Sequence, residues 1–171
     1  TWSRSRDSSA SHRKKIKNSE ATGVREPLPD DIAFRLQKAL ELQPPALQYI
    51  AGDNRLPKLG DALINFIASV SETVRLGIPT GLRVDNRMLT KSVRESGLRE
   101  GLAHRRSRHM LGDDAEALIA YAWIKGGVTM EEYVDSMLRG GSLQGGMTLV
   151  LCLAIERAGV MKGDIHEDQG R

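Results

Sequence analysis

The chain has 171 residues, of which 40% are hydrophobic and only 4% are aromatic. Its 25 basic and 22 acidic side chains give a net charge of +3, and a single cysteine excludes a framework of internal disulfides. No run approaches the roughly 18 apolar residues of a membrane span, so we expect a soluble protein with no membrane partner. A core poor in aromatic residues favours helices over strands.

The two ends of the chain differ in composition from its middle. Residues 1–29 are rich in Ser, Arg and Lys without apolar periodicity, which is typical of a disordered basic arm. A beginning of this kind also resembles an organellar transit segment, so we expect a cytoplasmic protein and leave an organellar location open. A helical domain is expected over residues 30–160, and residues 161–171 are expected to form a frayed tail.

The middle of the chain predicts an all-α fold, a bundle of about seven or eight helices without strands. Apolar side chains recur at helical spacing, and Gly, Pro and capping residues mark the breaks, with Thr129 as a clear N-cap. In chain order, helices are predicted over 31–40, 46–51, 57–77, 85–95, 98–103, 113–125, 129–139 and 146–158. We place a basic loop at 104–109.

The apolar positions of these helices predict what is buried. In the longest helix, the buried stripe is expected at Leu59, Leu63, Phe66, Ile67, Val70 and Val74, and in the first helix at Ile32, Leu36, Ala39 and Leu40. The apolar surface of the longest helix exceeds what a small monomer usually hides, which predicts a homodimer with this helix near the interface. Cys152 lies in an apolar run and is expected to be a buried structural thiol.

Three carboxylates form the main candidate for a functional site. Asp113 and Glu116 are three positions apart on a predicted helix, so they share a face. Asp61 lies in phase with the buried stripe of the longest helix, where an unpaired carboxylate is costly and needs a partner. Mg²⁺ or Mn²⁺ would bind such carboxylates and can activate water for phosphodiester hydrolysis. The alternative interpretation is that Asp113, Asp114 and Glu116 cap a helix and that Asp61 pairs with an arginine.

The residues around these carboxylates resemble two motifs of the ribonuclease III family. Residues 55–63, Arg-Leu-Pro-Lys-Leu-Gly-Asp-Ala-Leu, resemble the first motif. Residues 113–127, which contain Glu-Ala-Leu-Ile and end in Gly-Gly, resemble the second. The motifs stand in the family's order. The resemblance implies an all-helical homodimer that cuts double-stranded RNA with a divalent metal in RNA processing. It also implies that Asp61 and Glu116 are catalytic and that Asp61, Asp113 and Glu116 hold the metal.

One position departs from the family pattern. Pro57 stands where the family has its first site glutamate, and Lys58 stands where a phenylalanine is usual. The loss of a carboxylate favours an alternative function, that of a catalytically weakened RNA-binding protein within a ribonucleoprotein. Short members of the family without this glutamate are nevertheless active, and the three retained carboxylates favour the enzyme.

The basic residues predict where RNA phosphates bind. The stretch after Gly127 is short for the family's double-stranded RNA-binding domain, so the chain resembles the short, stand-alone type. Residues 92–98, Ser-Val-Arg-Glu-Ser-Gly-Leu, most resemble archaeal members. Phosphate contacts are then expected from Arg105, Arg106 and Arg108 of the basic loop and from Lys14 and Lys15 of the arm. The two histidines of the loop, His104 and His109, are expected to join this patch rather than bind metal.

Overall fold

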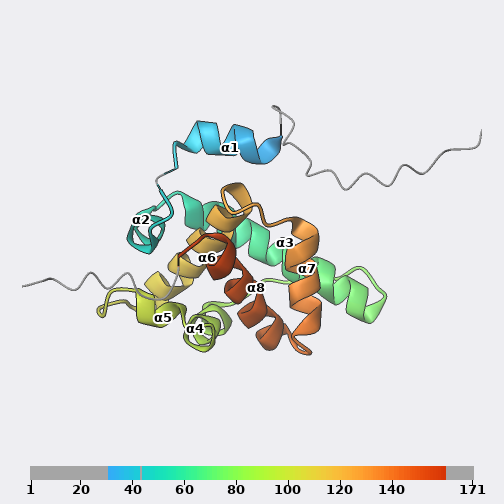
Figure 1. The fold of residues 1–171 in the computed structure, drawn as a ribbon. Coiled ribbons are helices and arrows are strands. Elements are labelled where there is room, and N and C mark those ends of the chain that lie inside the picture. Colours follow the sequence, from blue (N-terminus) through green and yellow to red (C-terminus); the bar gives the residue numbers. More distant parts are fainter. Residues whose placement is uncertain (1–30, 43, 161–171) are drawn as a thin grey trace, which may run out of the picture.

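The computed structural model of the chain describes residues 31–42 and 44–160. These residues form eight helices and no strand, which confirms the predicted all-α bundle (Figure 1). The expected basic arm over 1–29 and the expected tail over 161–171 lie outside the described residues. The helices are α1 (Ile32–Leu40), α2 (Leu47–Gly52), α3 (Leu56–Leu76), α4 (Asn86–Glu95), α5 (Leu98–Gly101), α6 (Arg108–Ile124), α7 (Met130–Arg139) and α8 (Leu143–Arg157).

Helix α6 lies at the centre of the bundle and contacts α1, α2, α3, α4 and α8 (Figure 1). From Ala115 to Ala122 its side chains are buried, apart from that of Glu116, which is half-buried. A helix that is apolar on nearly all sides must be surrounded, and its four alanines in this stretch let the neighbouring helices come close. Glu116 therefore places a charge on the central helix of an apolar core.

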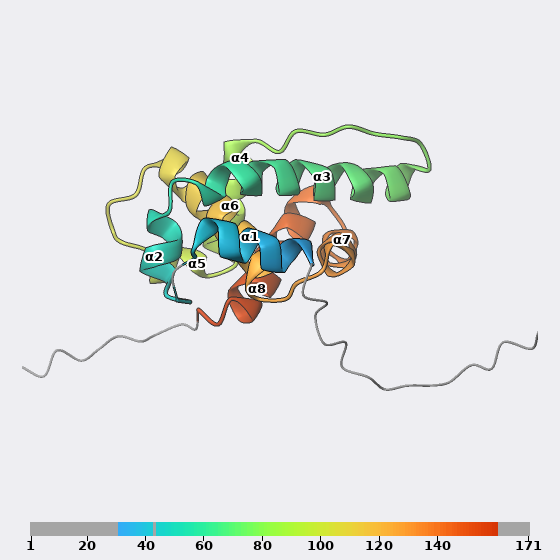
Figure 2. The ribbon, with the colours of Figure 1, turned by 90° about the horizontal axis from the view of Figure 1, so that it is seen from above.

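The buried face of α3 differs from the prediction. Leu63 and Ile67 are buried as expected, but Phe66 and Val74 are 54% and 61% exposed. The observed buried stripe also contains Gly60 and Ser71, which a search for apolar side chains misses because neither residue has one. Because each residue rotates the helix by about 100°, Phe66 lies about 100° from Ile67 and off this face. Val74 is in phase with Ile67, but it is exposed because the last turns of α3 extend past α7 (Figures 1 and 2).

Two helices begin earlier than predicted. Helix α6 begins at Arg108 and not at position 113, because the hydroxyl of Ser107 caps it by accepting a hydrogen bond from the Met110 N–H at 3.2 Å. Helix α8 begins after Ser142, which caps it in the same way. The predicted cap at Thr129 is confirmed, and it forms a reciprocal capping box with Glu132.

Two predictions of burial outside α3 are wrong. Cys152 is exposed, because it lies on the outer side of α8 while its neighbour Leu151 packs into the core. Ile32 at the start of α1 is 64% exposed, Ala39 is also exposed, and Leu36 and Leu40 are only half-buried, because α1 lies at the edge of the bundle (Figure 1). No helix of the described residues is long and apolar enough to cross a membrane.

The linker between α3 and α4 returns alongside α3 (Figure 2). Gly77 ends α3 with a φ of 71°, a left-handed conformation that favours glycine. The chain then runs back in an extended form as far as Asp85, whose side chain caps α4 by accepting from the Met88 N–H at 2.8 Å. This return brings the linker to the same end of the bundle as the first turns of α3.

Candidate active site

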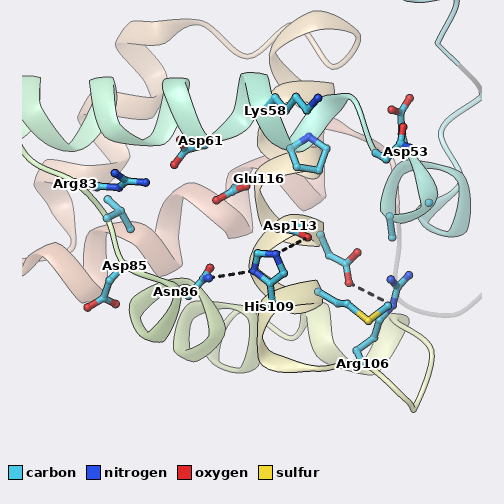
Figure 3. Close-up of a pocket in the computed structure, with 17 residues that line it drawn as sticks. Asp53, Lys58, Asp61, Arg83, Asp85, Asn86, Arg106, His109, Asp113 and Glu116 are labelled. Atoms are coloured by element: carbon cyan, nitrogen blue, oxygen red, sulfur yellow. Dashed lines mark hydrogen bonds and ion pairs between the residues drawn. The ribbon is translucent and has the colours of Figure 1, made fainter.

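A pocket of about 630 Å³ opens where α3, α6, the end of α2 and the linker before α4 meet (Figure 3). All three predicted site carboxylates line it. Asp61 comes from the second turn of α3, and Asp113 and Glu116 come from neighbouring turns of α6. The other lining residues are Ala51, Gly52, Asp53, Asn54, Pro57, Lys58, Arg83, Val84, Asp85, Asn86, Arg106, His109, Met110 and Asp114.

The neighbourhood of Asp61 and Glu116 depends on a glycine. Gly60 is buried against α6, where a Cβ atom at position 60 would overlap the backbone carbonyl of Glu116. The absence of a side chain therefore lets the two helix backbones approach until Asp61 and Glu116 face the same space, as Figure 3 shows. This contact explains why a glycine directly precedes the aspartate in the first motif.

The interpretation of these carboxylates as helix caps is wrong. Asp113 and Glu116 lie well inside α6, and Ser107 caps that helix instead. Asp61 forms no ion pair within the described residues, and its Oδ1 accepts a hydrogen bond from the Asn65 amide at 3.0 Å. Asp61 is also half-buried and not deep in the core. Neither helix capping nor pairing with an arginine therefore accounts for the position of these three carboxylates in the pocket.

The electrostatics of the pocket fit a bound cation. Burial, together with the negative charges of Asp61 and Asp113, raises the pKa of Glu116 to about 7. A divalent cation would relieve this repulsion, and carboxylate oxygens are the ligands that Mg²⁺ and Mn²⁺ prefer. Within the part of the chain that the structure describes, however, no three acidic, histidine or cysteine side chains stand close enough to hold a metal ion. The donors are of the right chemistry, but their side chains would have to rotate to converge.

Position 57 supplies no donor, and its neighbours do not replace it. Pro57 lies in the first turn of α3 and lines the pocket, as the motif comparison predicts. Asp53 lies nearby, but Arg55 holds its carboxylate at 2.6 Å and lowers its pKa. The same carboxylate also accepts from the Leu56 N–H at the start of α3. Asp53 is thus already engaged by the chain itself.

Arg106 and Asp114 form a partly buried ion pair that the sequence did not predict. Asp114 is 2% exposed, and its Oδ2 lies 3.4 Å from the Arg106 Nε. Burial raises the pKa of Asp114 to about 6, against the opposing effect of Arg106. Arg106 was expected as a phosphate contact on the basic loop, and its side chain is only 17% exposed and lines the pocket. No sequence pattern distinguishes Arg106 from its neighbours, because the burial of its partner arises from tertiary packing.

The other basic candidates are distributed differently. Arg105 and Arg108 are exposed and lie outside the pocket lining. Lys58 and Arg83, which were not predicted as RNA contacts, line the pocket beside the carboxylates (Figure 3). Lys14 and Lys15 lie outside the described residues. The pocket therefore combines an acidic centre with basic side chains at its edge, from α3, the linker and the loop before α6.

His109 contributes to the pocket in a way that the sequence did not indicate. Because α6 begins at Arg108, His109 lies on the helix one turn before Asp113 and shares its face. Its Nε2 lies 3.7 Å from an Asp113 carboxylate oxygen, and its Nδ1 lies 3.4 Å from the Asn86 amide nitrogen. His109 therefore contacts one predicted site carboxylate directly, and His104 is exposed outside the pocket.

The fold and the pocket together define a helical domain with an acidic site bordered by cationic side chains. The family model described as Ribonuclease III matches residues 54–145, more than half of the chain and the whole of the pocket-forming helices α3 and α6. The chain therefore belongs to the ribonuclease III family, as the two motifs predict. A comparison with curated proteins finds no match. Membership of the family supports an endoribonuclease-type function.

Proposed function

We propose that this chain is a divalent-metal-dependent endoribonuclease that hydrolyses phosphodiester bonds of double-stranded or structured RNA during RNA processing. The observation that carries the proposal is the shared pocket of Asp61, Asp113 and Glu116, in which burial, with a further contribution from the charges of Asp61 and Asp113, raises the pKa of Glu116. Selection for stability alone would not favour such repulsion, whereas a bound cation would balance it. The family generally uses divalent metal ions and acts on structured RNA.

The roles of the pocket residues follow from their charges. Asp61, Asp113 and Glu116 would hold Mg²⁺ or Mn²⁺, with Asp61 and Glu116 as the catalytic pair that the two motifs imply. When bound, the metal would polarise the phosphate and lower the pKa of the attacking water. Arg106, Lys58 and Arg83 would bind the phosphate oxygens on either side of the cleaved bond, and thereby orient the strand across the acidic centre.

Contacts farther along the RNA would come from exposed basic residues. Arg105 and Arg108 are exposed and adjoin in sequence the lining residues Arg106 and His109, and they would contact phosphates without reading bases. Lys14 and Lys15 are proposed to add to this attraction. The proposal therefore expects RNA affinity that falls steeply with salt and depends little on sequence.

A homodimer is part of the same proposal. Four large apolar side chains of α3 and the turn after it are each more than half exposed: Phe66, Val74, Leu76 and Ile78. A surface of this kind marks an interaction site, and the family typically dimerises. Sedimentation at micromolar concentration is expected to give twice the 18.8 kDa of one chain, and Val74→Glu is expected to reduce it to the monomer. A monomeric wild type would contradict the dimer but not the site.

A second candidate function is RNA binding without efficient cleavage. Pro57 favours it, because the pocket holds one carboxylate fewer than the family pattern and Asp53 is engaged by Arg55. Both functions predict RNA binding and differ only in turnover. The retention of Asp61, Asp113 and Glu116 favours the enzyme, because a binding protein has no need of mutually repelling carboxylates.

The experiment that tests the proposal is a cleavage assay on a long RNA duplex and on a single strand of the same sequence. We expect cleavage of the duplex with Mg²⁺ or Mn²⁺, none with a chelator, and products with 5′-phosphate ends. Binding of the duplex without cleavage in either metal would favour the RNA-binding protein. Equal cleavage with chelator present would contradict metal dependence.

A further inference from the structure

Three polar side chains of α3 hold the returning linker by its backbone. The N–H groups of residues 80, 82 and 84 donate to Thr73 Oγ1 at 3.0 Å, Ser69 Oγ at 2.9 Å and Asn65 Oδ1 at 2.8 Å. Four residues of helix rise about 6 Å and two residues of extended chain rise between about 6 and 7 Å, so the two series stay in register. The linker is thus fastened to α3 at three successive helical turns.

The amide of Asn65 makes a contact that the two hydroxyls do not. Its Oδ1 accepts from the Val84 N–H, and its Nδ2 donates to Asp61 Oδ1 at 3.0 Å. The acceptor role of Oδ1 fixes the orientation of the amide, since only Nδ2 can then face the carboxylate. Asn65 thereby joins a predicted metal-binding aspartate on α3 to the linker segment that carries Arg83 into the pocket.

We infer that Asn65 is a positioning residue of the active site, which orients Asp61 and holds the linker wall of the pocket at the same time. The inference rests on the proposed function. One oxygen of Asp61 is held by Asn65, which leaves Oδ2 for a cation and restricts rotation of the carboxylate. Hydrogen bonds to metal-binding groups typically change metal affinity or activity by roughly 10–100-fold when they are removed.

Ser69 provides a matched control for Asn65. Asn65 and Ser69 bind the backbone on the two sides of Arg83, at Val84 and at Leu82, and both are half-buried on α3. Only Asn65 also contacts Asp61. If Asn65 only held the linker through its backbone hydrogen bond, then Asn65→Ala and Ser69→Ala should change Mg²⁺ affinity and kcat alike.

The test compares wild type, Asn65→Ala and Ser69→Ala by calorimetric Mg²⁺ titration, by kcat and KM on duplex RNA, and by amide hydrogen exchange. We expect faster exchange at Val84 in the first variant and at Leu82 in the second. Mg²⁺ affinity and kcat should fall about tenfold in Asn65→Ala alone, with KM changed little. Equal losses in both variants, or no loss in either, would overturn the inference.

A second measurement separates this inference from the proposed function. The side-chain amide signals of Asn65 in a ¹⁵N-correlated NMR spectrum should shift in Asp61→Ala, and Val84 should exchange faster there, whether or not the wild type binds Mg²⁺. Unchanged signals and exchange would overturn the positioning role. A wild type that neither binds metal nor cleaves RNA, but shows these shifts, would instead contradict only the proposed function.

Discussion

Gly60 of α3 lies directly against the backbone carbonyl of Glu116 on α6, with no room for a Cβ atom between them. Relief would require movement of a whole helix, because the obstacle is backbone and not the end of a flexible side chain. We therefore expect Gly60→Ala to lower the free energy of unfolding by about 1–3 kcal/mol, the usual range for overpacking. Gly52, at the end of α2, has no atom within 4 Å of its would-be Cβ. Thermal unfolding should leave Gly52→Ala close to wild type, and an equally stable Gly60→Ala would mean that the two helices are not in tight contact.

Metal-free protein should lose stability as pH rises, in part through Glu116. Its pKa is raised from 4.5 to about 7 in the folded state, so folding favours the protonated form. The contribution of Glu116 to the free energy of unfolding is therefore present in full below about pH 4.5 and is lost as pH rises through about 7. In chelator, Glu116→Gln should match wild type near pH 5 and be more stable above pH 7. We expect about 1 kcal/mol, well below the full shift, because the carboxylate is partly exposed. Melting curves of both proteins over this pH range test the prediction. A stability difference between Glu116→Gln and wild type that is the same at every pH would contradict the raised pKa of Glu116.

Position 57 should report on the missing carboxylate. Pro57 lies in the first turn of α3, one turn before Asp61, and lines the pocket. Pro57→Glu should lower the Mg²⁺ concentration for half-maximal cleavage by roughly fivefold, since one added charge near a cation contributes about 1 kcal/mol in a solvated site. Pro57→Gln introduces a side chain of the same size as glutamate but without its charge, and its Mg²⁺ requirement is expected to resemble that of the wild type. Cleavage across a Mg²⁺ series decides between them, and identical curves for all three proteins would place the side chain of residue 57 away from the metal.

Arg106 and Arg105 are neighbours with different environments, and their alanine variants should differ accordingly. Each change should weaken RNA binding. Each should also reduce the slope of the logarithm of RNA affinity against the logarithm of salt concentration by about 1, the loss of one phosphate contact. Arg106→Ala also leaves Asp114 buried without its partner and should cost about 1–3 kcal/mol of stability. Arg105 is exposed, so its removal should change stability by less than about 0.5 kcal/mol. RNA binding at several salt concentrations and melting temperatures test both parts, and equal stability of the two variants would refute the buried pair.

The sequence was sufficient to predict features that depend on local chemistry. The all-α fold followed from helical spacing, and the cap at Thr129 followed from its own side chain and the glutamate three residues later. The meeting of Asp61 with Asp113 and Glu116 in one pocket followed from two motifs rather than from spacing. Spacing alone left the capping interpretation open, because the start of α6 depends on Ser107, which precedes a glycine-containing turn that does not look helical.

Features that depend on packing were not predicted. The buried face of α3 includes Gly60 and Ser71, which fit the interface by being small and so do not appear in an apolar pattern. The roles of Asn65 and Arg106 depend on partners 19 and 8 positions away, brought close by the returning linker and by the turn before α6. Neither partner can be identified until the path of the chain is known.

The carboxylates of the pocket are proposed to serve metal-dependent cleavage, and matched charge-removing variants provide the decisive test. Asp61→Asn and Glu116→Gln each keep the shape of the side chain, whereas Glu131→Gln removes a charge from an exposed site on α7 outside the pocket. We predict that Asp61→Asn and Glu116→Gln lower kcat on duplex RNA at least a hundredfold in Mg²⁺, while helicity and RNA affinity stay near wild type. Glu131→Gln should cleave normally. Normal cleavage by both pocket variants would show that these carboxylates are not needed for the reaction.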